Sequence, residues 1–173
     1  MLPITVYFHN DEPNPKTEDI ITSISYSEAY QSFKALTSEY HSMNNLKEID
    51  AFFSNHLDQG FIDLKVFKKL LTLLISDNKI KLQIKGYCSP LAENEYNINL
   101  SKRRISSVEN ELKEDETLFK AISNNQLIIE ELPFGETKAK KEVSDNYNNV
   151  KESVYNPKAC LERKVSIIAI QIP

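Results

Sequence analysis

The chain has 173 residues, with 21 lysines and arginines against 25 aspartates and glutamates, for a formal net charge of −4 at pH 7. That length suffices for one domain with a substantial core, but two full domains would be cramped. The mild acidity argues against nucleic-acid binding, which usually requires an excess of basic residues, and no apolar run approaches the length of a membrane span.

The N-terminal third begins with a strand pattern and continues with a helical one. Residues 4–8 alternate and are β-prone, so we expect a first strand there, followed by a loop over 9–15, which holds two prolines and two asparagines. Apolar residues then recur at spacings of three and four within 16–48. They predict one amphipathic helix with a largely aromatic stripe, formed by Tyr26, Tyr30, Phe33, Leu36 and Tyr40. The stripe suits core packing better than a sugar-binding platform.

Two further helices are predicted over 49–56 and 61–75, with a break near Gly60 between them. The second of these helices places four apolar residues on one face, namely Phe67, Leu70, Leu71 and Leu74. Strict alternation over 80–85 then predicts a strand with one apolar face.

The C-terminal half is predicted to continue as loop, helix, short helix, strand, surface loop, short helix and strand. The corresponding ranges are 87–95, 100–112, 114–125, 126–132, 134–156, 157–163 and 165–172. The last strand is apolar on both faces, so we expect it inside the sheet rather than at an edge. The complete order predicts an α/β two-layer sandwich, with helices on one face of a mixed sheet.

Neither the cysteines nor the histidines form a ligand or catalytic pattern. Cys88 and Cys160 are too far apart in sequence for a zinc site or a redox pair, so we expect two free, partly buried thiols, although an oxidising compartment would permit pairing. The three histidines lie well apart. No nucleophile elbow, base or orienting acid accompanies Cys88 or Ser89, so we expect neither an enzyme nor a metal or cofactor site.

A motif on the predicted second strand and the helix after it resembles a known family. Residues 84–90 (IKGYCSP) and 96–108 (YNINLSKRRISSV) resemble the signature of OmpA-like peptidoglycan-binding domains, of the OmpA C-terminal and MotB–Pal type. In that signature a strand ends in Gly-aromatic-Thr-Asp, and a helix carries Asn-x-x-Leu-Ser-x-x-Arg-Ala-x-x-Val. Two shorter matches follow in the same order, FGE at 134–136 and ACLERKVSI at 159–167.

The resemblance implies a single OmpA-like domain with a βαβαββ mixed sheet. Residues 1–8 would form its first strand, 9–48 a partly helical insertion, and 49–173 the core. It also implies a non-catalytic module that binds the peptide stem of peptidoglycan through diaminopimelate and anchors an outer-membrane or periplasmic assembly. The variant resembles those of Bacteroidetes envelope proteins. We therefore expect part of a longer exported protein, located in the periplasm at the outer membrane, with peptidoglycan and envelope proteins as candidate partners.

Diaminopimelate is zwitterionic, so its site needs an acid for the ammonium and a base for the carboxylate. The resemblance assigns the carboxylate to Arg104, whose planar guanidinium can donate two parallel hydrogen bonds. It assigns Asn97 to the ligand or the loop backbone. Cys88 and Ser89 fall at the family's Thr and Asp positions.

Ser89 departs from the family, because a hydroxyl cannot hold an ammonium as a carboxylate does. Losing one charge-assisted hydrogen bond costs about 1.5–3 kcal/mol, or roughly tenfold to a hundredfold in affinity. We hypothesise that Asp11 or Glu12 supplies the missing acid, since the C-terminal loops of parallel strands share one edge of a sheet. Glu93 and Glu95 are the alternatives.

Several of these residues have structural alternatives. Asn97 could equally anchor the loop or cap the helix, and Arg163 could line the site or form a structural ion pair. Arg103 is expected to face elsewhere, toward solvent or the rim of the site. The competing function is a protein-interaction scaffold that does not bind the wall, in which the aromatic insertion 16–48 forms the partner surface.

Overall fold

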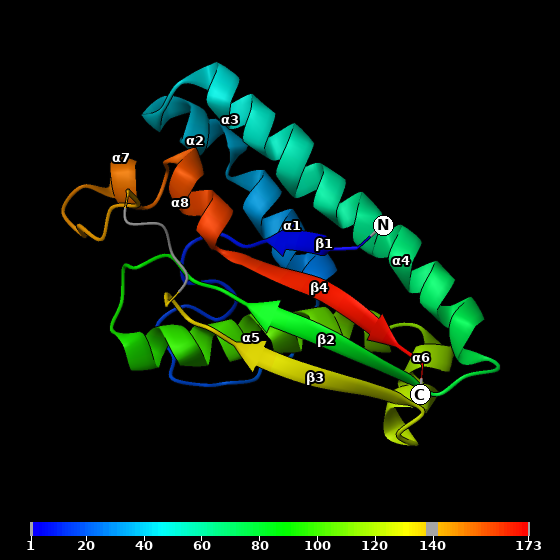
Figure 1. The fold of residues 1–173 in the computed structure, drawn as a ribbon. Helices are drawn as coiled ribbons and strands as arrows, with labels where there is room; N and C mark the ends of the chain where they lie inside the picture. Colours follow the sequence, from blue (N-terminus) through cyan, green and yellow to red (C-terminus); the bar gives the residue numbers. More distant parts are fainter. Residues whose placement is uncertain (1, 138–141, 173) are drawn as a thin grey trace.

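The computed structural model describes residues 2–137 and 142–172, which form a four-stranded mixed sheet with its main helices packed against one face (Figure 1). The strands are β1 (Ile4–Tyr7), β2 (Ile80–Gly86), β3 (Leu127–Pro133) and β4 (Lys164–Gln171). Their spatial order is β1-β4-β2-β3, with β4 antiparallel to both neighbours and β2 parallel to β3. The predicted α/β sandwich is confirmed, and β4 occupies the interior position expected of a strand apolar on both faces.

The helices fill the connections between the strands. They are α1 (Tyr26–Ala35), α2 (Thr37–Met43), α3 (Leu46–Phe52), the π-helical η1 (Phe53–Asp58), α4 (Gln59–Ile75), α5 (Asn94–Lys113), α6 (Glu116–Ser123), α7 (Val150–Ser153) and α8 (Pro157–Glu162). Local signals start several of them. Ser25 and Glu28 form a reciprocal capping box at α1, and the Asp115 carboxylate caps α6.

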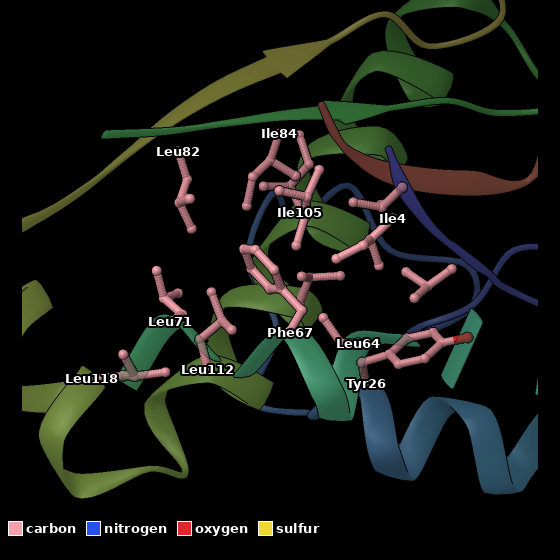
Figure 2. Packing of buried hydrophobic residues seen from close by; sticks show 14 of the residues in the cluster. Ile4, Tyr26, Leu64, Phe67, Leu71, Leu82, Ile84, Ile105, Leu112 and Leu118 are labelled. Atoms are coloured by element: carbon pink, nitrogen blue, oxygen red, sulfur yellow. The ribbon is translucent and has the colours of Figure 1, made fainter. Parts of the chain in front are cut away.

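The main core lies between the sheet and the helices. On β2, Ile80, Leu82 and Ile84 are buried, while the intervening polar residues lie on the other face. The helical side chains of the same core cluster come from α1, α4, α5 and α6, and they include Tyr26, Leu64, Phe67, Leu71, Ile105, Leu112 and Leu118 (Figure 2). The segment between β1 and β2 therefore contributes to the core through α1 and α4.

The stripe of residues 16–48 is buried at Tyr26, Phe33 and Tyr40 and half-buried at Tyr30 and Leu36, and two helices carry it instead of the single one predicted. Leu36 ends α1, and its N–H bonds back to the carbonyls of Phe33 and Lys34 before α2 begins. Phe33 and Tyr40, one from each helix, then meet in a second core cluster with Phe52, Phe53 and Leu57. Because Tyr26, Phe33 and Tyr40 have no exposed surface, they pack as expected and cannot form a partner surface.

The predicted helix break at Gly60 is wrong, because α3, η1 and α4 follow one another without interruption. Gly60 marks a close contact instead. A Cβ at this position would lie 2.3 Å from the carbonyl oxygen of Thr5, so the helix backbone rests directly on the edge strand β1. The buried face of α4 also differs from the predicted one, since Leu70 and Leu74 remain 40% and 39% exposed.

Among the described residues, none of the helices combines the length and the apolar character needed to cross a membrane.

We expect Gly60→Ala to lower the free energy of unfolding by about 1–3 kcal/mol, because the added methyl group overlaps the Thr5 carbonyl and must push α4 away from β1. At an open helical position the same change would stabilise by roughly 0.5–1 kcal/mol. Urea unfolding measures the difference. The neighbouring exposed Gln59→Ala is the control, and a Gly60→Ala variant as stable as this control would contradict the contact.

Candidate functional site

The loops that follow β1 and β2 meet at one edge of the sheet. Both strands run antiparallel to β4 and therefore parallel to each other, so their C-terminal ends lie on the same side. The hypothesis that Asp11 lies near Ser89 required the two strands to be parallel, and they are.

A cavity of about 380 Å³ lies at this edge, between the loop after β1, the segment after β2 and the first turns of α5. Most of the predicted site residues line it: Asp11, Cys88, Ser89, Asn97 and Arg104. Glu12, Glu95 and Arg163 are not among the lining residues, whereas Glu93 is.

Other lining residues were not predicted. Lys16 and Glu18 come from the segment treated as an insertion, and Tyr147 from the loop after β3. Tyr96 stands next to Asn97 inside the motif, so its position was a usable signal. The cavity thus combines the carboxylates of Asp11, Glu18 and Glu93 with two cationic side chains.

Arg104 is fully buried and is bonded mainly to backbone carbonyls. Nε donates to the Glu12 carbonyl at 2.9 Å, Nη1 to the Tyr87 carbonyl at 2.9 Å and to the Cys88 thiol at 3.4 Å, and Nη2 to the His9 carbonyl at 3.2 Å. These bonds use all but one of the five guanidinium N–H groups. Burial lowers the pKa of Arg104 to about 10, which still leaves it charged at neutral pH.

The predicted pair of parallel bonds from Arg104 to a ligand carboxylate is therefore not available in this arrangement, because only one N–H remains. Within the described part of the chain, no carboxylate forms an ion pair with Arg104. The positive charge lines the cavity, but its directed hydrogen bonds point into the protein.

Arg103 does not face elsewhere as predicted, but is buried against the same loop. Its Nε donates to the Pro13 carbonyl at 2.7 Å, and Nη1 donates to the carbonyls of Thr17 and Asp19 at 3.1 and 2.6 Å. Nη2 lies 3.8 Å from an oxygen of Asp11. The two successive arginines of α5 together hold the backbone of residues 9–19, and part of this loop lines the cavity.

Asp11 is held by local backbone chemistry. It adopts a positive φ of 57°, a conformation that Asp and Asn tolerate better than most residues. One carboxylate oxygen accepts the Lys16 N–H at 2.9 Å, and the other accepts the Tyr96 hydroxyl. A carboxylate offers about four acceptor positions, so Asp11 retains capacity for a ligand ammonium.

Glu12 differs from Asp11 in its surroundings. Its backbone carbonyl, rather than its carboxylate, contacts Arg104, and burial together with the charge of Asp11 raises the pKa of its carboxyl group. Of the two acids hypothesised for the role, Asp11 lines the cavity and Glu12 does not.

Asn97 anchors two neighbouring segments. Its Nδ2 donates to the Ala92 carbonyl at 2.8 Å and to the Glu136 carboxylate at 2.9 Å. Gly135 adopts a φ of 56°, which brings the turn close against α5. The Phe-Gly-Glu match thus lies beside the main motif, and Asn97 acts as a loop anchor.

Cys88 and Ser89 are buried and line the cavity. The Cys88 thiol donates to the Asn97 carbonyl at 3.2 Å, and burial raises its pKa to about 11, so it is a neutral thiol. Cys88 and Cys160 are both free and buried.

Arg163 lies in a separate buried cluster and not in the cavity. Nη2 donates to the Val154 carbonyl at 2.7 Å and to the Cys160 sulfur at 2.8 Å, while Nε and Nη1 have no hydrogen-bond partner within the described residues. Neither predicted role, lining the site or forming an ion pair, is seen for this residue in the described part of the chain.

His9 lies between this cluster and the cavity wall. Its Nδ1 is 2.9 Å from the Tyr40 hydroxyl. Burial, reinforced by the charges of Arg163 and Arg104, lowers the pKa of His9 to about 3, so the ring is neutral at physiological pH.

Comparisons of the chain with protein-family models, with curated proteins and with solved structures found no match. Any assignment of function therefore depends on the motif residues and on the geometry of the cavity.

We expect Arg103→Met to lower the free energy of unfolding by about 2–5 kcal/mol, because the carbonyls of Pro13, Thr17 and Asp19 would lose their donor. Urea unfolding measures the loss, and limited proteolysis should cut residues 10–20 faster. The matched control is Lys102→Met, one residue away and partly exposed. Equal stability of the two variants would contradict the role given to Arg103.

The depressed pKa of His9 predicts acid sensitivity. In the unfolded chain His9 is protonated below about pH 6.5, whereas in the folded protein it is protonated only near pH 3. The free energy of unfolding therefore falls as the pH drops through this window. Between pH 7 and pH 5 the parent should lose about 2 kcal/mol more than a His9→Gln variant. Parallel pH profiles of the two proteins would contradict the shift, since the carboxylates contribute equally to both.

Proposed function

We propose that the protein is an OmpA-like, non-catalytic module that binds the peptide stem of peptidoglycan and tethers an outer-membrane or periplasmic assembly to the wall. One observation carries the proposal: the Asp11 carboxylate lines the same cavity as Ser89, the position at which this chain lacks the acid of the family pattern. The βαβαββ order of the main elements and the position of the motif at the cavity support it. The proposed location is the periplasm.

In this proposal the ammonium of diaminopimelate donates to Asp11. The acid is oriented by the Tyr96 hydroxyl and the Lys16 N–H, so little side-chain order remains to be imposed on binding. The positive charges of Arg104 and Lys16, which both line the cavity, offset the negative charge of the ligand carboxylate.

The direct test is co-sedimentation with purified sacculi, comparing the parent with Asp11→Asn. Asparagine tolerates the positive φ and keeps an acceptor for the Lys16 N–H, so the loop should survive while the charge is lost. We expect affinity to fall roughly tenfold to a hundredfold. Asp63→Asn on α4 is the matched control, since Asp63 does not line the cavity. Equal binding by parent and Asp11→Asn would reject Asp11 as the ammonium site.

A second candidate, an interaction scaffold, is favoured by one feature of α4. Its outer face exposes a stripe of apolar residues at helical spacing, namely Ile62, Val66, Leu70, Leu73 and Leu74. This stripe, rather than the buried aromatic residues, would be the partner surface. Absence of sacculus binding by both the parent and Asp63→Asn would favour this candidate over the wall anchor.

A further inference from the structure

We infer that the cavity selects the side-chain ammonium of the stem peptide and is nearly indifferent to the carboxylate beside it, so that stems with L-lysine bind about as well as those with diaminopimelate. The inference rests on the proposed function. L-Lysine is diaminopimelate without the terminal carboxylate. The two residues therefore differ only in the group with which the cavity interacts weakly.

The first reason is the state of Arg104. Four donor contacts already tie its guanidinium to the carbonyls of Glu12, Tyr87 and His9 and to the Cys88 thiol. Turning two N–H groups toward a ligand would leave buried carbonyls without a donor, which costs about as much as the new bonds would gain. Arg104 therefore offers a ligand carboxylate a single N–H and a screened charge.

The second reason is the exposure of the other cation. Lys16 lies on the exposed part of the loop after β1. Ion pairs between exposed side chains contribute little, because water screens the charges and the long side chain must be ordered. A carboxylate that relies on Lys16 should gain no more than about fivefold in affinity.

The third reason is the surplus of acceptors. Asp11, Glu18 and Glu93 all line the cavity, against the two lining cations Lys16 and Arg104, while Arg103 does not line it but lies with Nη2 3.8 Å from Asp11. Asp11 has both oxygens fixed and still has free acceptor positions, whereas no lining cation is similarly oriented toward the cavity by contacts within the described residues. A ligand ammonium can thus bind the already oriented carboxylate of Asp11, whereas a ligand carboxylate finds no cation oriented in the same way.

The test uses soluble tripeptides and calorimetry on the full chain. The probes are L-Ala-γ-D-Glu-meso-diaminopimelate, the same peptide ending in L-lysine, and the lysine peptide acetylated on its side-chain nitrogen. We expect the first two dissociation constants to agree within about fivefold and the acetylated peptide to bind at least tenfold more weakly. Lys16→Gln should reduce any preference for diaminopimelate.

The other outcomes separate the two claims. If the lysine peptide binds more than fivefold more weakly than the diaminopimelate peptide, the inference fails while the proposed function stands. If the acetylated peptide binds as tightly as the unacetylated lysine peptide, selection of the ammonium group is rejected. If none of the peptides binds, the proposed function fails and the inference fails with it.

Discussion

The candidate site depends on how the backbone carbonyls of residues 9–19 are satisfied. This loop leaves the sheet after β1, so no neighbouring strand supplies N–H groups that could donate hydrogen bonds to its carbonyls. Arg103 and Arg104 supply the donors from α5, on the far side of the loop. These contacts fasten the loop to α5 in the arrangement in which Asp11 lines the same cavity as Ser89.

The same bonds restrict what the cavity can recognise. A guanidinium that donates to three carbonyls and a thiol contributes its charge to the cavity, but little directed hydrogen bonding. In the proposed function, the directed contact to the ligand therefore comes from Asp11 in the loop after β1, whose carboxylate accepts the hydroxyl of Tyr96 on α5. The proposed binding in the absence of an acid at Ser89 requires that the loop after another strand, β1, brings the carboxylate of Asp11 to the same edge.

The sequence predicted the elements whose residues follow a regular period, and was less informative where tertiary contacts decide. The alternation of 80–85 and the two-sided apolar character of 165–172 predicted β2 and the interior position of β4. Gly60 suggested a break because glycine weakens a helix, yet its role is to let the helix touch the Thr5 carbonyl, which no local pattern records. Arg103 was misjudged for a similar reason: the carbonyls that bury it lie 84 to 90 residues away in sequence.

Amide chemical shifts, measured while a soluble diaminopimelate tripeptide is added to the isotope-labelled protein, test the central claim most directly. We expect the largest shifts in the loop after β1 around Asp11, in residues 88–93 and in the first turns of α5 near Tyr96. The exposed face of α4 should be unaffected. Shifts centred on α4 would contradict peptide binding at the cavity and favour an interaction surface on that helix. An absence of shifts at the cavity at saturating peptide concentrations would contradict it too.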